Sequence, residues 1–299
     1  MVPLRQAQDQ GRRILDAARL ILGIHCDVRK GPLAALRWAR ALGCPLMQMF
    51  SYRRHEEAAS EEAARFKAAR EAGDPIALVS HVRYLPFIAS GDRPWRERSV
   101  ELLAREIALA HALGARGLIL HMGAYSPGST LREGMRLFTD GVREAWERSE
   151  GRVPLWVENV PGGGRRMGGR LEELGETLSA LSAHGVETGA CLDTAHAWAQ
   201  GFDLSSREGM GSFLDRAHRI LGARSVKAFH LNDSRALRGS FREDHRHWGE
   251  GFLGAEGLSA LLERPEFRDA LGILETPPGK DAENLAFVKR LMPTASGGS

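Results

Sequence analysis

The sequence predicts an α/β fold: one (β/α)8 TIM barrel with an extra helix at its N-terminus. Eight short apolar runs recur along the 299 residues, and a stretch with helical spacing follows each of them. Several runs are almost unbroken in apolar character, which is typical of parallel strands buried on both faces. Their even spacing, and the lack of an early Gly-x-Gly-x-x-Gly fingerprint, favour a barrel over a doubly wound sheet.

The expected strands are short, and most end on a polar residue. In chain order they are Leu20–His25, Pro45–Phe50, Ala77–Val82, Gly117–Met122, Pro154–Val160, Thr188–Asp193, Val226–Asp233 and Leu271–Thr276. Helical composition marks the intervening segments Glu56–Glu71, Pro94–Leu113, Leu131–Glu150 and Leu171–His184. Gly114, Gly185 and Gly222 stand where helices are expected to end, because glycine adopts the left-handed C-cap conformation at little cost.

We expect a helical extension over residues 1–22, a single barrel domain over 23–293 and a disordered tail over 294–299. The helix Leu4–Leu22 is expected to cover the bottom of the barrel, with a targeting role as the alternative. No run approaches ~18 uncharged apolar residues, so no membrane segment is expected. The odd, sparse cysteines (Cys26, Cys44, Cys191) favour a reducing compartment, and we expect a cytoplasmic monomer.

The balance of 41 Lys and Arg against 38 Asp and Glu gives a net charge of +3, which permits an anionic partner without requiring one. Histidines or carboxylates end seven of the eight expected strands: His25, His81, His121, Glu158, Asp193, His230 and Glu275. A barrel collects these ends at the face that carries active sites. One such histidine is more often a hydrogen-bonded core residue. Seven histidines and carboxylates at one face favour a metal site, because converging carboxylates repel unless a cation lies among them.

Two local arrangements extend this set. Asp193-Thr-Ala-His196 places a carboxylate and an imidazole three residues apart at an expected strand-to-helix turn. In the segment Glu243-Asp244-His245-Arg246-His247, alternate side chains share one side if the loop is extended. Alone, this segment is typical of a solvated loop, but beside the other candidates it is expected to form a wall of the site.

The candidate ligands are five histidines and four carboxylates: His81, His121, His196, His230, His245, Glu158, Asp193, Glu243 and Glu275. Mixed nitrogen and oxygen donors suit zinc or manganese better than calcium or magnesium. Nine ligands exceed the needs of one ion and suffice for about three, if a carboxylate bridges two of them. Three divalent ions carry +6 against −4 from the carboxylates, which suits a phosphodiester anion.

The chain resembles the endonuclease IV family of apurinic/apyrimidinic endonucleases from about Ile21 to Leu291. The strongest motifs are Cys191-Leu-Asp-Thr-Ala-His196, His230-Leu-Asn-Asp-Ser234 with Gly239-Ser240, Gly249-Glu-Gly251, and Leu274-Glu-Thr276. Weaker ones are Gly23-Ile-His25, His81-Val-Arg-Tyr-Leu85, His121-Met-Gly123 and Glu158-Asn159. Their joint order and spacing make the resemblance specific.

The resemblance implies a DNA-repair enzyme that hydrolyses the phosphodiester 5′ to abasic sites in double-stranded DNA, leaving a 3′ hydroxyl and a 5′ deoxyribose phosphate. Action as a 3′-phosphodiesterase is left open. The resemblance also implies a cluster of three Zn²⁺ ions, with Mn²⁺ as an alternative at one or more sites. His81, His121 and Glu158 would hold the first ion; Glu158, Asp193, His230 and Glu275 the second; and His196, Glu243 and His245 the third. Glu275, Glu158 and Asp193 would be catalytic, with Glu275 orienting or deprotonating the nucleophile.

By position, Tyr84 and Leu85 match residues that the family pushes into the duplex, and Arg53 and Arg54 are natural phosphate contacts. An abasic nucleotide lacks base stacking, so its extrusion costs less than that of a normal nucleotide. The alternative is that Tyr84 and Leu85 only pack the loop after the third strand.

Departures from the family leave some assignments open. Glu243-Asp244-His245 stands where the family has Asp-Arg-His, so Asp244 could replace Glu243, or His247 could replace His245. The rival function is a metal-dependent sugar or sugar-phosphate isomerase or epimerase, which would use Glu158, Asp193, His230 and Glu275 alone. A non-catalytic, metal-dependent nucleic-acid-binding protein is the third alternative.

Overall fold

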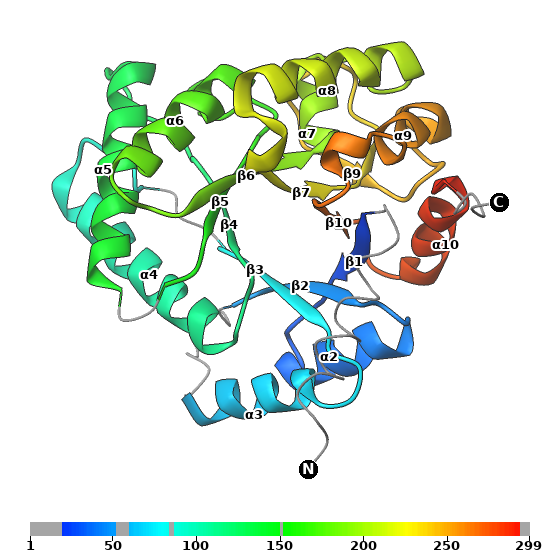
Figure 1. Ribbon diagram of the computed structural model, residues 1–299. Helices are drawn as coiled ribbons and strands as arrows, with labels where there is room; N and C mark the ends of the chain where they lie inside the picture. Colours follow the sequence, from blue (N-terminus) through cyan, green and yellow to red (C-terminus); the bar gives the residue numbers. More distant parts are fainter. Residues whose placement is uncertain (1–19, 52–59, 84–86, 150–151, 294–299) are drawn as a thin grey trace.

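The computed structural model describes residues 20–51, 60–83, 87–149 and 152–293. Within them, eight parallel strands close into a barrel, and helices surround it (Figure 1). The strands are β1 (Ile21–His25), β2 (Leu46–Phe50), β3 (Ala77–His81), β4 (Leu118–His121), β5 (Leu155–Glu158), β6 (Thr188–Asp193), β7 (Val226–His230) and β10 (Leu271–Leu274). β10 pairs with β1 and β7, which closes the ring. The predicted TIM barrel is confirmed.

The helices follow the strands in alternation. They are α2 (Pro32–Ala41), α3 (Ser60–Glu71), α4 (Arg93–Ala112), α5 (Leu131–Arg148), α6 (Leu171–Ala183), α7 (Thr194–Gln200), α8 (Arg207–Leu221), α9 (Gly254–Leu262) and α10 (Asp281–Leu291). Side-chain caps start several of them: Asp92 accepts the Trp95 amide at α4, and Thr130 accepts the Glu133 amide at α5. No helix of the described ranges is long and apolar enough to cross a membrane.

The start of β1 differs from the expected boundary between extension and barrel. Ile21 and Leu22 belong to β1, in agreement with the expected strand Leu20–His25, whereas the expected helix Leu4–Leu22 overlapped that strand. The unbroken apolar run with two isoleucines suits a strand buried on both faces. Residues 1–19 and the expected tail at 294–299 lie outside the described residues.

The two-residue period of the strands explains why the polar residues meet. Leu46, Val79, Ile119, Trp156, Cys191, Ala228, Leu271 and Ile273 form one packed cluster with Ile21 and Ala77. On each of the strands β3 to β7 and β10, the metal-ligating candidate follows one of these residues by two positions. Because side chains two apart on a strand share a face, the candidates form the layer above this apolar plug.

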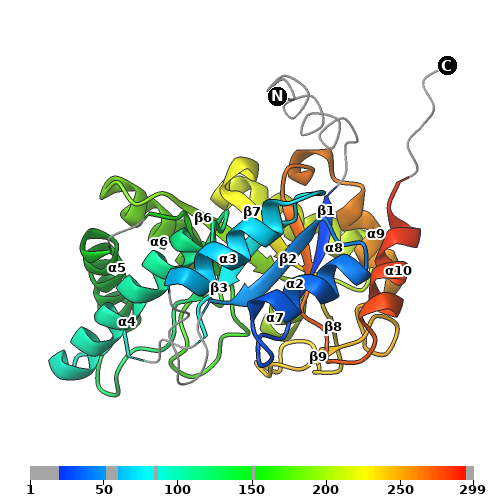
Figure 2. The same ribbon diagram turned by 90° about the horizontal axis from the view of Figure 1, so that it is seen from below.

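The loop after β7 contains a hairpin that the sequence did not predict. The expected run Val226–Asp233 is interrupted after His230, and β8 (Asp233–Ser234) pairs antiparallel with β9 (His245–Arg246). Figure 2 shows both short strands at the lower edge of the molecule. Asp233 anchors the returning chain, because its carboxylate accepts the amides of Gly249, Gly251 and Leu253. At Gly251 a Cβ atom would lie 2.4 Å from Asp233 Oδ1, so only glycine fits this approach.

Candidate metal centre

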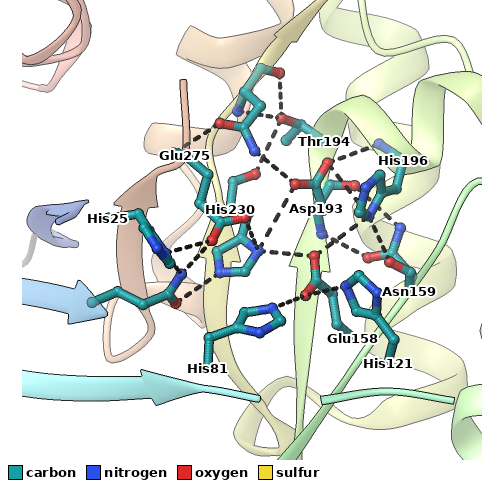
Figure 3. A network of polar contacts seen from close by, with 12 residues as sticks. His25, His81, His121, Glu158, Asn159, Asp193, Thr194, His196, His230 and Glu275 are labelled. Atoms are coloured by element: carbon teal, nitrogen blue, oxygen red, sulfur yellow. Dashed lines mark hydrogen bonds and ion pairs between the residues drawn. The ribbon is translucent and has the colours of Figure 1, made fainter. Parts of the chain in front are cut away.

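Three groups of candidate metal-ligating side chains converge at the C-terminal ends of the strands. Figure 3 labels all of their members except His245. The groups are His81, His121 and Glu158; then Glu158, Asp193, His230 and Glu275; then Asp193, His196 and His245. In each group one nitrogen or oxygen atom from every member lies within 4.8 Å of the others. Glu158 belongs to two groups and Asp193 to two, so the groups form one continuous centre.

The first group is built around one oxygen of Glu158. Glu158 Oε2 lies 3.0 Å from His81 Nε2 and 2.9 Å from His121 Nε2. His81 Nδ1 lies 2.7 Å from the Val82 carbonyl oxygen, which can only accept a hydrogen bond. That contact leaves Nε2 of His81 as the atom with a free lone pair. Glu158 is fully buried, whereas the His121 side chain is 39% exposed and marks an open side of the centre.

The second group is the most enclosed part of the centre. His230 Nδ1 lies 2.9 Å from Glu158 Oε1, 3.2 Å from Glu275 Oε2 and 3.8 Å from Asp193 Oδ2. His230 and Asp193 are fully buried, and the Glu275 side chain is nearly so. Three buried carboxylates this close to one imidazole require positive charge among them, because an unbalanced buried charge costs several kcal/mol.

The third group brings two imidazole nitrogens face to face. Nε2 of His196 and Nε2 of His245 lie 3.4 Å apart, and Asp193 Oδ2 lies 3.5 Å from the latter. Both rings direct Nδ1 at a backbone carbonyl, of Asn159 for His196 and of Glu275 for His245. Two lone pairs in this position need a proton or a cation between them. The chemistry of the donor set therefore fits a bound metal.

The loop after β7 places both Glu243 and His245 near His196, but a third residue, Asp193, lies closer to His245 than Glu243 does to His196. Glu243 Oε2 is 3.8 Å from His196 Nε2, but its side chain is 56% exposed, and Asp193 completes the third group instead. Glu243 projects from the loop after β7, while Asp193 ends a barrel strand directly beside the histidines. Asp244 pairs with Arg246, and His247 Nδ1 contacts Asn284, so both alternatives to the expected ligands are engaged elsewhere.

Two asparagines that the sequence did not single out hold the carboxylates in place. Asn232 donates to Asp193 Oδ2 at 2.7 Å and accepts the backbone amide of Glu275 at 2.9 Å. Asn159 Oδ1 accepts the backbone amide of Asp193 at 2.6 Å. Both are almost completely buried. Their signal in the sequence is position, because an amide directly follows Glu158 and another lies two residues after His230.

The electrostatics indicate that protons and cations compete for this centre. Burial opposes the charged form of His196, but Asp193 and Glu158 outweigh burial and hold the pKa of His196 well above its usual value. Burial also opposes ionised Glu158, yet His230 and His121 outweigh it and hold the pKa of Glu158 well below its usual value. The pKa of Glu275 is lowered in the same way, by His230 and His25 against burial.

These shifts predict how the stability of metal-stripped protein depends on pH. The raised pKa of His196 contributes stability that is present below about pH 6.5 and lost as the pH rises through the raised value. The lowered pKa of Glu158 contributes stability above about pH 4.5 that is lost only in stronger acid. A cation needs deprotonated imidazole, so its stabilising effect grows with pH.

We therefore expect the difference in Tm between zinc-loaded and chelator-treated protein to widen from pH 6 to pH 9. Scanning calorimetry at matched ionic strength measures it. A difference that stays constant across this range would show that the histidines do not exchange protons for metal.

The sequence profile of the xylose isomerase-like TIM barrels matches residues 36–291. A probable endonuclease 4 of Solibacter usitatus is 38% identical over 283 residues, covering 90% of this chain and 96% of that protein. The chain belongs to the endonuclease IV family. The crystal structure of endonuclease IV from Thermus thermophilus has a TM-score of 0.76 at 30% identity, over 90% of this chain and 98% of that one. A D-tagatose 3-epimerase-like protein shares the fold alone, with a TM-score of 0.71 at 17% identity over 91% and 97% of the two chains.

Membership of the endonuclease IV family confirms the predicted family and makes the chain a nuclease. The buried His, Asp and Glu groups are of the kind that bind metal. The four residues expected to contact DNA, Arg53, Arg54, Tyr84 and Leu85, lie outside the described residues.

Proposed function

We propose that this chain is a metal-dependent endonuclease that hydrolyses the phosphodiester 5′ to abasic sites in double-stranded DNA. The products would be a 3′ hydroxyl and a 5′ deoxyribose phosphate. The observation that carries the proposal is the convergence of three ligand groups through shared carboxylates at the mouth of the barrel. The names of the relatives, which are endonucleases of this family, support the same reaction class.

We propose three Zn²⁺ ions per chain, with Mn²⁺ as the alternative at one or more sites. His81, His121 and Glu158 would hold one; Glu158, Asp193, His230 and Glu275 a second; His196, His245 and Glu243, with Asp193 close by, the third. When bound, such cations activate water and neutralise charge on the phosphodiester and its leaving oxygen.

The residues of the chain have separable tasks in this proposal. Glu158 joins two groups and fixes their spacing, because its two oxygens face different histidines. Glu275 presents one carboxylate oxygen to the second group and would accept the proton of the attacking water. His121 and Glu243 are the most exposed members, so the phosphodiester would approach from their side.

DNA contacts are proposed for Tyr84 and Leu85 as wedges and for Arg53 and Arg54 as phosphate contacts. The described neighbour Arg83 lies over the ring of Phe50, 5.4 Å from its centroid, beside β2 and β3. A 3′-phosphodiesterase activity, a monomeric state and a cytoplasmic location accompany the proposal. The division into an N-terminal extension, one barrel domain and a tail over 294–299 also accompanies it, with the barrel beginning at β1 (Ile21–His25) rather than at residue 23.

The test is incision of a duplex with one abasic site, beside an intact duplex and a panel of sugar phosphates. We expect cleavage of the abasic strand alone, with a 3′ end that a polymerase extends directly. An unsaturated 3′ sugar would indicate lyase chemistry and contradict hydrolysis. Turnover of a sugar phosphate without incision would instead favour an isomerase that uses Glu158, Asp193, His230 and Glu275.

The third group gives a prediction about metal content. Glu243→Ala should lose one ion and most activity, since Glu243 Oε2 lies 3.8 Å from His196 Nε2, and its pKa is lowered to about 2, mainly by the neighbouring imidazole of His196. Asp244→Ala and His247→Ala are the matched controls and should retain all three ions. Elemental analysis of dialysed protein decides. Loss of the ion from Asp244→Ala alone would mean that the loop uses a different register.

A further inference from the structure

Gln48 is a polar residue in the apolar strand β2, where its neighbours are Leu46, Met47, Met49 and Phe50. It is fully buried. By the two-residue period of the strand, Gln48 lies on the same face as Leu46, which belongs to the plug inside the barrel. A primary amide at this position needs hydrogen-bond partners, because leaving a buried donor or acceptor unpaired is destabilising.

Those partners are members of the second ligand group. Gln48 Oε1 lies 2.9 Å from His230 Nε2. Gln48 Nε2 donates to Glu275 Oε1 and lies 2.8 Å from His25 Nδ1, which is itself 3.0 Å from that carboxylate oxygen. Figure 3 shows His25, His230 and Glu275 gathered at this point. One side chain therefore contacts two proposed ligands of one ion from behind.

The chemistry of these partners fixes the orientation of the amide. A carboxylate can only accept, so the NH2 end of Gln48 must face Glu275. The carbonyl end of Gln48 can then only accept from His230, so Nε2 of His230 must carry a hydrogen. Nδ1, which faces Glu158 and Glu275, is thereby left as the nitrogen that can bind a cation.

His230 differs in this respect from three other histidines of the centre. His81, His196 and His245 each direct Nδ1 at a backbone carbonyl, which the fold itself holds in place, and present Nε2 to the centre. His230 presents the opposite nitrogen and relies on a side chain for its outer contact. Its tautomer is therefore controlled by a residue that substitution can remove without changing the backbone.

We propose that Gln48 is a positioning residue: it keeps the hydrogen of His230 on Nε2 and turns Glu275 toward the metal. The proposal rests on the proposed binding of metal by the second group, and not on which substrate is cleaved. Outer contacts of this kind commonly change metal affinity by about 10–100-fold when removed.

Two substitutions separate the acceptor from the donors. Gln48→Met has nearly the same shape and no hydrogen-bonding end, so it removes both contacts. Gln48→Glu keeps an acceptor for His230 but sets a second carboxylate against Glu275. Ser80→Ala is the matched control, because Ser80 is buried on the neighbouring strand and its hydroxyl has no partner among the described residues.

The readouts are zinc affinity by chelator competition, and ¹H–¹⁵N spectra of zinc-loaded protein labelled in histidine. The signals of His230 are assigned as those missing from the spectrum of His230→Ala. In the unsubstituted protein we expect His230 to bind zinc through Nδ1 and to show an Nε2–H signal that is protected from exchange with water. Gln48→Met should lose that protection and lose affinity about 10–100-fold at one site. Gln48→Glu should keep the Nε2–H signal and still lose affinity, while Ser80→Ala changes neither.

Coordination of His230 through Nε2 in the unsubstituted protein would overturn the proposal even if both variants failed to fold. Unchanged affinity in Gln48→Met would do the same. Neither readout requires DNA, so an absence of abasic-site incision would refute the proposed function while leaving this proposal to be judged separately.

Discussion

Replacing Glu158 by glutamine is expected to cause the largest loss of function of any single change in the centre. Its two oxygens serve different groups, since Oε2 faces His81 and His121 whereas Oε1 faces His230. An amide of the same shape has one oxygen, so one group must face an NH2 that cannot bind a cation. We expect the loss of at least one ion and a fall in incision of at least about 10³-fold, or ~4 kcal/mol of transition-state stabilisation.

Glu106→Gln is the matched control for this prediction. Glu106 is also a buried glutamate, on α4, and burial raises its pKa to about 7 even though Ser51 donates to its carboxyl group. It belongs to none of the three groups, so its amide variant should keep the full metal content. Elemental analysis and single-turnover incision measure both variants. Full metal content in Glu158→Gln would remove its bridging role.

The sequence could predict the barrel and most of the centre because both depend on local periodicity. Apolar runs of even spacing determine the strands, and a polar residue at the end of such a run must lie at the mouth of a parallel barrel. His81, His121, Glu158 and Asp193 are of this kind, and each lies two residues beyond an inward-facing position. For these residues, knowledge of the strand is enough to know where the side chain lies.

Other features depend on contacts between segments, which periodicity does not contain. Gln48 contacts His230, at the end of β7, and Glu275, directly after β10, both far from it in sequence, so only the closed barrel shows these partners. The β8–β9 hairpin depends on a pairing of two-residue strands across a long loop, and strands this short carry no periodicity of their own. The membership of Asp193 in the third ligand group is also such a contact. Asp193 Oδ2 lies 3.5 Å from His245 Nε2, whereas Glu243 Oε2 lies 3.8 Å from His196 Nε2.

The alternation of side chains along β2 is a sequence signal that points to Gln48. In Leu-Met-Gln-Met-Phe, residues 46, 48 and 50 share a face, and Phe50 lies one position beyond Gln48 on it. A buried amide on the inward face of a barrel strand, just below a layer of histidines, has those histidines as its nearest polar partners. Charged residues at strand ends indicate the metal ligands, whereas the residue that orients them is neutral and lies one layer below.

Glu275→Gln is expected to leave the fold intact and to reduce turnover more than substrate binding. Glu275 belongs to one ligand group, so at most one ion should be affected. His230 and His25 hold the pKa of its carboxyl group below the usual value, against the effect of burial, and this lowered pKa favours the ionised form. An amide cannot accept the proton of an attacking water, and general-base contributions are typically about 10²–10⁴-fold.

We therefore expect kcat to fall by about 10³-fold with KM for an abasic duplex nearly unchanged. The matched control is Glu283→Gln, which removes the same charge from an exposed position in the first turn of α10 and should leave both constants unchanged. Metal content measured in parallel separates the two tasks of Glu275. A variant that keeps every ion and loses turnover assigns the residue to proton transfer, and one that loses an ion assigns it to metal binding. Near-normal kcat with all ions bound would exclude Glu275 from the reaction. The proton acceptor would then be one of the other two carboxylates that face His230, which are Glu158 and Asp193.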